Sequence, residues 1–443
     1  MSRLMVSVSG VRGIYGDGLN DECAEKFAYA FGKLYGNPVV VGRDSRKSGE
    51  ALSRAVISGL RKAGTDVIYT GLASTPTVEM AVTARHAAGG VIITASHNPE
   101  EWNGLKFLNP DGIFLNADQG SELLDRYNSL ENLAHENLTG SFDTWDGANE
   151  HHIQSVLNLD FIDHETIASR KFTVCIDMVN GAGGPICCDL LRQLGCMIYA
   201  IHEEPTGNFA HNPEPVPEHI LELCALVKEK QADTGFAVDP DVDRLSIVDE
   251  KGHALGEEYT LALAADYLME KTGTPAACNL STSRMIDDAA KRHDVLVHRS
   301  PVGEINVVEL MREVGAGVGG EGNGGIIVPA CHPGRDAVLG IALILQIMAD
   351  RQKKISELAG TFPKYHIIKT KVEITPTGSW RNAVKNIFKD QEMNELDGIK
   401  ILFPDSWVHV RESNTEPVVR IIAEAPEYEH ANDLAAMVKK ILI

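Results

Sequence analysis

A serine that follows an apolar run is the first candidate nucleophile. Ser96 lies in the segment T-A-S-H-N-P (residues 94–99), directly after the apolar residues 89–93, which predict a buried strand. The Asn-Pro pair favours a turn, which would expose the hydroxyl of Ser96 with His97 beside it. Such a hydroxyl could carry a transferred group. A serine that merely caps a turn, next to a surface histidine, would leave the same sequence.

Three aspartates at a spacing of two form the next candidate site. Asp239, Asp241 and Asp243 lie in the segment D-P-D-V-D-R, between two apolar runs. Carboxylates held between buried strands repel one another unless a cation lies among them. Magnesium prefers oxygen ligands of this kind, and the glycine that a calcium EF-hand needs at its sixth position is missing. We therefore predict a magnesium site with Arg244 placed to contact a phosphoryl oxygen; a solvated acidic turn is the alternative.

A glycine-rich segment could recognise a sugar. Residues 319–325 read G-G-E-G-N-G-G, and five glycines in seven residues allow the backbone to approach a ligand closely. The carboxylate of Glu321 and the amide of Asn323 would point the same way in an extended chain, and they suit vicinal sugar hydroxyls. The segment lacks the Lys-Ser/Thr of a P-loop and the acidic residue of a dinucleotide-binding fold. A flexible turn is the alternative interpretation.

A donor-rich loop near the C-terminus could hold a phosphate. The segment R-E-S-N-T-E-P (residues 411–417) lies between two expected strands and combines a guanidinium, two hydroxyls and an amide. A decorated hairpin turn is the alternative. Two isolated cations complete the set, each of which could be ordinary surface: Arg12 in S-G-V-R-G and Lys106 in N-G-L-K. The candidate phosphate ligands are Arg411, Ser413, Asn414 and Thr415, followed by Arg420.

The elements that must position these residues alternate between strands and helices. Residues 39–41 predict a strand and residues 48–62 a helix, and the alternation recurs twice before residue 363. This pattern predicts an α/β fold with three similar mixed α/β domains, each of which ends in one of the polar turns, followed by a smaller α+β domain. Because ligands bind outside the carboxyl ends of strands, we expect the turns to face one central cleft. The expected domains are residues 1–150 (nucleophile), 151–251 (metal), 252–362 (sugar) and 363–443 (phosphate).

Charge and composition exclude several classes of partner. The chain has 443 residues and a net charge of −21, so nucleic acid and anionic membranes would be repelled. Its eight cysteines are sparse and include no C-x-x-C pair, which is typical of free thiols in a reducing compartment. Residues 1–13 contain no apolar run of signal-peptide length, and no apolar run has membrane-spanning length. We expect a cytoplasmic protein, monomeric or homodimeric, that draws in an anionic ligand through a local basic pocket.

Taken together and in this order, the motifs resemble those of the α-D-phosphohexomutase family over the whole chain. The resemblance implies three α/β domains and a smaller fourth around a cleft. It makes Ser96 the phosphoserine, the three aspartates with a phosphoserine oxygen the magnesium ligands, and the glycine-rich segment the sugar loop. It implies that the donor-rich loop clamps a phosphate, and it matches the loops that contain Arg12 and Lys106.

The family interconverts hexose 1- and 6-phosphates, and the form E-G-N-G-G of the sugar loop is similar to phosphoglucosamine mutases of the archaeal type. The resemblance implies a hexosamine phosphate as substrate and a hexose bisphosphate as intermediate and activator. Magnesium, Arg244 and Arg12 would neutralise charge, and Lys106 or His97 would act as base. Phosphomannomutase or phosphoglucomutase is the alternative. A phosphatase and a non-catalytic sugar-phosphate-binding protein are more distant ones.

Overall fold

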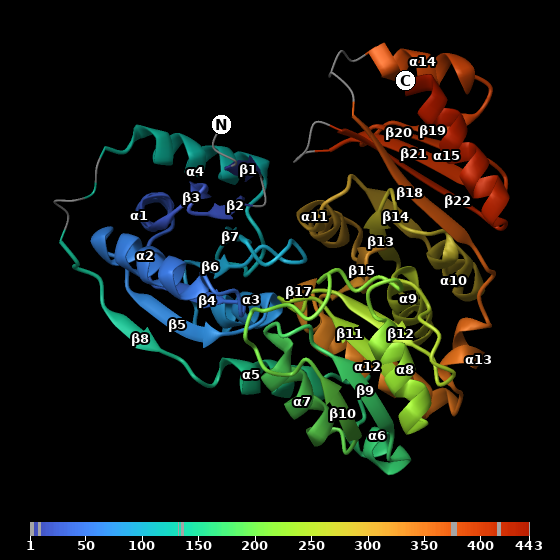
Figure 1. Cartoon of the computed structure of the whole chain (residues 1–443), viewed down its shortest axis with the longest axis horizontal. Coiled ribbons are helices and arrows are strands. Elements are labelled where there is room, and N and C mark those ends of the chain that lie inside the picture. Colours follow the sequence, from blue (N-terminus) through green and yellow to red (C-terminus); the bar gives the residue numbers. More distant parts are fainter. Residues whose placement is uncertain are drawn as a thin grey trace. The chain divides into compact units, whose positions relative to one another are not determined.

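A computed structural model describes residues 4–7, 10–131, 133, 137–373, 379–413 and 418–442 of the chain. Figure 1 shows the helices and strands, coloured along the sequence. The chain divides into two compact units. The first unit contains residues 1–264 and 324–359, and the second contains residues 265–323 and 360–443. The division falls inside helix α9 (Glu258–Thr272).

An eight-stranded sheet forms the N-terminal part of the first unit. Its order is β1-β2-β7-β6-β4-β5-β8, and β3 pairs with β2. The central β4 is parallel to β5 and β6, whereas β7 is antiparallel to both β6 and β2. The strands are β1 (Met5–Ser7), β2 (Gly10–Tyr15), β3 (Gly18–Leu19), β4 (Val39–Arg43), β5 (Val67–Leu72), β6 (Gly89–Ile93), β7 (Trp102–Leu108) and β8 (Phe142–Thr144).

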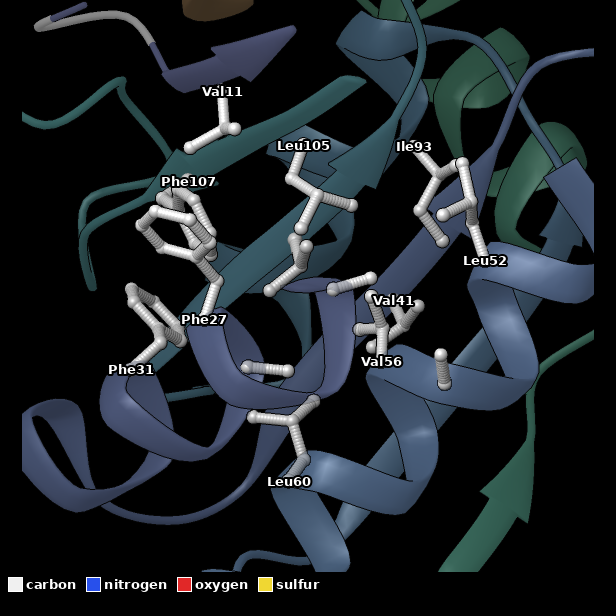
Figure 2. Packing of buried hydrophobic residues seen from close by; sticks show 14 of the residues in the cluster. Val11, Phe27, Phe31, Val41, Leu52, Val56, Leu60, Ile93, Leu105 and Phe107 are labelled. Carbon is white, nitrogen blue, oxygen red and sulfur yellow. The ribbon is translucent and has the colours of Figure 1, made fainter. Parts of the chain in front are cut away.

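Alternating side chains of this sheet build two cores. Val39 and Val41 of β4 pack on one face against α1 and α2, in the cluster drawn in Figure 2. Val40 points to the other face, where it packs with residues of α3. Every residue of β4 except Arg43 is buried, as expected for a strand covered on both faces. The helices of this part are α1 (Asp21–Tyr35), α2 (Gly49–Lys62), α3 (Thr75–Ala84) and α4 (Ala117–Ser129).

A second sheet in the first unit has the order β10-β9-β11-β12. Its first three strands are parallel, and β12 returns antiparallel to β11, so the β11–β12 connection lies at the carboxyl end of β11. The strands are β9 (Thr173–Asp177), β10 (Met197–Ile201), β11 (Thr234–Val238) and β12 (Leu245–Val248). The accompanying helices are α5 (Ala148–Leu157), α6 (His164–Arg170), α7 (Gly183–Gln193) and α8 (Leu221–Lys230).

The first unit also contains a hairpin and a strongly buried helix. Strands β16 (Gly325–Val328) and β17 (His332–Arg335) are antiparallel and lead into α12 (Ala337–Arg351), which α13 (Ile355–Ala359) follows. The side chain of Asp336 caps α12 by accepting hydrogen bonds from the backbone N–H groups of Val338 and Leu339. Residues 337–349 of α12 are all buried, so this helix has no polar stripe.

The second unit combines a parallel and an antiparallel set of strands. Strands β14 and β15 flank β13 in parallel, with α10 and α11 between them in the chain. The antiparallel sheet has the order β18-β22-β21-β20-β19 and packs with α14 and α15. The elements are β13 (Ala276–Asn279), α10 (Met285–His293), β14 (Val297–Ser300), α11 (Glu304–Val314), β15 (Val318–Glu321), β18 (His366–Glu373), α14 (Ser379–Ile387), β19 (Glu392–Asn394), β20 (Ile399–Leu402), β21 (Trp407–Glu412), β22 (Val418–Ala425) and α15 (Tyr428–Leu442).

The fold class predicted from the sequence is confirmed. The sheets before residue 363 are mixed and flanked by helices, and the C-terminal sheet is an antiparallel α+β arrangement. None of the helices in the described ranges combines the length and the apolar composition that crossing a membrane requires.

Side chains of α1 and α2 pack together in the core on one face of the first sheet, and we expect this packing to contribute to the free energy of unfolding. Leu60 is fully buried in the cluster of Figure 2. We expect Leu60→Ala to lower the free energy of unfolding by about 2–5 kcal/mol, because it removes apolar contacts and leaves a cavity. Urea denaturation monitored by circular dichroism measures the change. Leu221→Ala is the matched control, because that side chain is 67% exposed and should leave the transition almost unmoved.

Candidate active site

The nucleophile predicted from the sequence lies in a turn with an unusual backbone. Ser96 follows β6 with a φ of 49°, a left-handed conformation that is uncommon for residues other than glycine. Its backbone N–H donates to Thr94 Oγ1, and the Thr94 hydroxyl in turn donates to Asp44 Oδ2 at 2.6 Å. The Ser96 side chain is buried, and its Oγ lies 3.1 Å from Asp239 Oδ2 and 3.3 Å from His97 Nδ1. The structure therefore brings Ser96, His97 and the first aspartate together.

One buried arginine holds this turn in shape. The guanidinium of Arg46, which is 1% exposed, donates to the backbone carbonyls of residues 96, 98, 99 and 102 and pairs with Asp44. The two Nη groups thus satisfy four carbonyls that would otherwise be left without these donors inside the turn, while Nε–H is taken by the Asp44 carboxylate. Sequence reasoning missed Arg46, because a residue that acts through backbone carbonyls leaves no motif around the carbonyls that it binds.

The three aspartates converge in the loop between β11 and β12. All three are fully buried, and Val242 between them has a φ of 63°, which is strained for a β-branched residue. Asp239 Oδ1 accepts hydrogen bonds from the backbone N–H groups of Asp243 and Arg244. The Thr75 hydroxyl donates to Asp241 Oδ2 at 2.7 Å. The loop is therefore fixed by its own backbone and by the first turn of α3.

Basic side chains from separate elements surround the aspartates. Lys106 Nζ on β7 lies 2.8 Å from Asp241 Oδ2 and 3.7 Å from Asp243 Oδ2, and an Nη of Arg335 on β17 lies 2.6 Å from Asp243 Oδ2. Arg244 Nε lies 3.7 Å from Asp243 Oδ1. Arg12 reaches Asn98 Oδ1 of the serine turn at 3.4 Å. Arg335 was not predicted as a site residue; the sequence marks it only as part of a charged R-D pair before the long apolar segment 337–349.

Burial and mutual repulsion set the protonation of this cluster. Burial, together with the charges of Asp243 and Asp241, raises the pKa of Asp239 well above its usual value. Burial would also raise the pKa of Asp241, but Lys106 and Thr75 outweigh it and lower that pKa. Burial lowers the pKa of His97 well below its usual value, and the charges of Arg244 and Arg12 add to the shift. Burial alone would lower the pKa of Lys106, yet the two aspartates raise it.

The donor set of this loop fits a divalent cation. Asp241 Oδ1 and Asp243 Oδ1 are buried oxygens without a hydrogen-bond partner, and unsatisfied carboxylate oxygens are costly in a dry site. Carboxylates close enough to share one ion also relieve their mutual repulsion when the ion binds. Two other groups of this kind, at His152, His332 and Asp336 and at Asp177, His202 and His211, are already joined by histidine–carboxylate hydrogen bonds. Among the described residues, the aspartate loop is therefore the best candidate metal site.

A histidine cluster holds the segment that covers Arg46. His202 Nδ1 and His211 Nε2 each lie 3.0 Å from the carboxylate of Asp177. Phe209, which lies between these histidines in the sequence, stacks over Arg46, and the distance from the guanidinium carbon to the ring centroid is 4.9 Å. Burial would raise the pKa of Asp177, but hydrogen bonds from both histidines lower it to about 2. The hydrogen bond to Asp177 raises the pKa of His202; burial lowers the pKa of His211, but Asp177 outweighs burial and raises it.

The remaining predicted residues belong to the second unit. Glu321 Oε1 accepts hydrogen bonds from Asn279 Nδ2 at 2.8 Å and from the Gly303 N–H at 3.2 Å, and Asn323 reaches Glu321 Oε2 at 3.4 Å. Arg411 on β21 is buried and lies opposite the exposed Arg420 in the register of β21 and β22.

The donor-rich loop is only partly described. The backbone N–H of Ser413 donates to the carbonyl of Val418. Asn414 and Thr415 lie outside the described residues. Their predicted phosphate contacts therefore remain predictions.

Segments from one end of the chain to the other match domains of one known protein family. Four successive segments match the phosphoglucomutase/phosphomannomutase family: residues 3–134 its alpha/beta/alpha domain I, residues 150–252 domain II, residues 256–365 domain III and residues 348–441 its C-terminal domain. A solved structure of a phosphoglucomutase/phosphomannomutase family protein from Burkholderia thailandensis superposes with a TM-score of 0.87 at 27% identity, covering 99% of this chain and 98% of that one.

Relatives with assigned names divide between two activities. A protein of Thermococcus kodakarensis called phosphoglucomutase/phosphomannomutase is 38% identical, over 98% of this chain and 97% of its own length. A probable phosphoglucosamine mutase of Methanopyrus kandleri is 33% identical, over 96% of this chain and 95% of its own. A phosphoglucosamine/phosphogalactosamine mutase of Sulfurisphaera tokodaii is 31% identical, over 99% of both chains.

Binding of a divalent cation to the aspartate loop can be tested directly. Titration calorimetry with magnesium chloride should show binding to the wild-type protein and at least a tenfold weaker affinity for Asp241→Asn, because the substitution removes a charged ligand. Asp160→Asn, which changes an exposed aspartate in the same way, should bind as the wild type does. Wild-type protein that bound no divalent cation would contradict the assignment.

The histidine cluster predicts a pH-dependent stability. The pKa values of His202 and His211 are raised in the folded state. Their contribution to the free energy of unfolding is therefore complete below pH about 6.5, the pKa of a free histidine, and is lost as the pH rises through the pKa values of the folded state. We expect His211→Gln to lower the thermal unfolding midpoint more at pH 6 than at pH 9. His164→Gln, at an exposed histidine, should show no such difference. An equal shift at both pH values would be inconsistent with the pairing.

Proposed function

The chain belongs to the phosphoglucomutase/phosphomannomutase family of α-D-phosphohexomutases, and from that premise we propose that it is a magnesium-dependent phosphoglucosamine mutase of the cytoplasm. The reaction interconverts glucosamine 6-phosphate and glucosamine 1-phosphate. The observation that carries the proposal is the position of Ser96 Oγ, 3.1 Å from a carboxylate oxygen of the buried aspartate loop. A hydroxyl in that position can hold a phosphoryl group directly over the candidate metal site.

The proposed reaction transfers a phosphoryl group twice. In the first transfer the bond from phosphorus to Ser96 Oγ breaks, a bond to the free hydroxyl of the sugar phosphate forms, and that hydroxyl gives its proton to a base. The resulting bisphosphate reorients. The bond from its other phosphorus to the sugar oxygen then breaks as a bond to Ser96 Oγ forms, and the base returns its proton to that sugar oxygen, so that the enzyme ends as phosphoserine again. From the sequence, Lys106 is the first candidate for the base, but Asp241 and Asp243 outweigh its burial and raise its pKa, so it would keep its proton while it pairs with them. His97, beside Ser96 Oγ and with a lowered pKa, is uncharged near neutral pH and is the candidate that these contacts favour.

The chain's own residues supply most of what such a transfer needs. Phosphoryl transfer depends on positioning and on neutralising the charge of the transferred group. Asp239, Asp241 and Asp243 would hold magnesium, which when bound neutralises charge on the phosphoryl oxygens. Arg12 and Arg244 offer guanidinium groups beside the serine turn and the aspartate loop for the same purpose.

Recognition of the substrate falls, in this proposal, to residues of the second unit. Glu321 and Asn323 are proposed to bind the sugar hydroxyls. The phosphate that does not react is proposed to bind Arg411 and Ser413 together with Asn414, Thr415 and Arg420. We assign four domains as the sequence indicated them: residues 1–150, 151–251, 252–362 and 363–443.

A second substrate class deserves equal testing, because one relative favours it. The protein from Thermococcus kodakarensis that is 38% identical is called a phosphoglucomutase/phosphomannomutase. Comparison of kcat/KM for the 1-phosphates of glucosamine, glucose and mannose, with a trace of the matching bisphosphate, decides between the two. We expect glucosamine 1-phosphate to be preferred. A preference for glucose or mannose would establish the alternative, and release of inorganic phosphate without isomerisation would contradict both.

The role of Ser96 has a direct test. We expect Ser96→Ala to lower turnover by at least about 10⁴-fold, because the phosphoryl group then has no carrier. Incubation of wild-type protein with labelled hexose bisphosphate should label Ser96, as mass spectrometry of the peptide can show. Ser129→Ala, at an exposed serine, should retain full activity. Substantial turnover by Ser96→Ala would refute the mechanism.

A further inference from the structure

A carboxylate outside the predicted site residues contacts the proposed phosphate-binding arginine. Asp397 lies between β19 and β20, and its Oδ2 accepts a hydrogen bond from Arg411 Nε at 2.9 Å. The same oxygen accepts from the backbone N–H of Val302 at 3.0 Å. The Arg411 side chain is 8% exposed and that of Asp397 is 21% exposed. This ion pair is thus largely removed from water, unlike surface pairs that contribute little.

The next peptide group links this pair to the sugar loop. The N–H of Gly303 donates to Glu321 Oε1, so two successive backbone N–H groups serve two different carboxylates. Gly303 has a φ of 127°, a conformation that side chains other than glycine rarely adopt. The positions of Asp397 and Glu321 are therefore set by one short, conformationally special piece of backbone.

A second series of hydrogen bonds also connects Asp397 with Glu321. His409 Nε2 lies 2.6 Å from the backbone carbonyl of Asp397, and His409 Nδ1 lies 2.9 Å from Ser281 Oγ. Burial lowers the pKa of His409 to about 4, so near neutral pH the ring is uncharged, with one N–H for the carbonyl and one lone pair for the hydroxyl. The backbone N–H of Ser281 donates to Asn279 Oδ1, and Asn279 Nδ2 donates to Glu321. Glu321 and Asp397 are thus joined on both sides.

The backbone at Asp397 is shaped to approach Arg411. The next residue, Gly398, has a φ of 73°, and a Cβ atom there would lie 2.2 Å from the Val410 carbonyl oxygen and 2.8 Å from Arg411 Cβ. Only glycine can bring the turn this close to β21. With Nε engaged by Asp397, the pair of Nη groups is the edge of the Arg411 guanidinium that can take a phosphate in a bidentate manner.

We propose that Asp397 is a positioning residue that orients Arg411 and ties it to Glu321, so that the phosphate-binding and sugar-binding groups form one rigid frame. The inference rests on the proposed function, since it concerns how that function's substrate is held. A mutase must bind its substrate in two orientations, with either phosphate on the same arginine. A frame of fixed spacing serves both orientations equally, whereas an arginine free to change rotamer would have to be ordered again at each binding event.

Kinetics of Asp397 variants test this frame in the full-length protein. We expect Asp397→Asn to raise KM for the preferred hexose phosphate about tenfold and to change kcat less than about threefold, because Arg411 binds a phosphate that does not react. Asp397→Glu, which keeps the charge on a longer stem, should recover part of the loss. Asp405→Asn, an exposed aspartate in the turn between β20 and β21, is the matched control and should behave as wild type.

A double-mutant cycle separates positioning from a general structural effect. If Asp397 acts through Arg411, adding Asp397→Asn to Arg411→Lys should raise KM little further, because the substituted lysine has no Nε to orient. Additive effects, an unchanged KM in Asp397→Asn, or a fall in kcat alone would overturn the inference. If Asp397→Asn did not fold, the same comparison with Asp397→Glu would decide. Wild-type protein that isomerised no hexose phosphate would instead refute the proposed function itself.

Discussion

Mutual repulsion of three buried carboxylates is the constraint on which the first unit depends. Asp239, Asp241 and Asp243 are fully buried within one short loop, and each would carry a charge that burial makes costly. Ion pairs from Lys106 and Arg335 reach this loop, and each of these residues lies on a strand distant in sequence. The two sheets and the β16–β17 hairpin of the first unit can be understood as the scaffold that brings these cations to the anions. Two carboxylate oxygens have no hydrogen-bond donor even so, and these are the oxygens that a divalent cation would bind.

The same constraint explains why the serine turn is so heavily braced. A phosphoryl group on Ser96 would add negative charge beside the aspartates, so the turn must resist being pushed away from them. Its left-handed residue is unfavourable alone and persists only where surrounding contacts determine it. Arg46 supplies those contacts through backbone carbonyls, and Phe209 closes over its guanidinium. The bracing is made by groups that never need to touch substrate.

Two kinds of feature could be predicted from the sequence: helices and strands with a periodic apolar pattern, and site residues that lie within short motifs. The strand at residues 39–41 and the helix at 48–62 were predicted almost at their observed bounds, because a buried strand between amphipathic helices has an unmistakable pattern. Helix α12 was not predicted: it is buried on all sides, so its apolar residues show no period. Arg335 was missed because its partner, Asp243, lies 92 residues away in the chain, and Asp397 because it stands outside every motif although Arg411 is only 14 residues away. The proximity of Ser96 to the aspartates was expected because both turns follow the carboxyl ends of predicted strands, and the family resemblance implied it as well.

Under the proposed function, the two units would serve phosphoryl transfer by different interactions. Around Ser96 the interactions are ionic, since the charge on the transferred group must be balanced while it changes partners. Around Glu321 and Asp397 the ion pair with Arg411 is supported by hydrogen bonds from backbone N–H groups, an amide and an uncharged histidine. Such bonds have narrow preferred geometry, so they can fix the spacing between the Arg411 guanidinium and the Glu321 carboxylate. A recognition site built on that principle can hold either end of a sugar bisphosphate with similar strength, and this is the property that a mutase needs if its intermediate is to turn round.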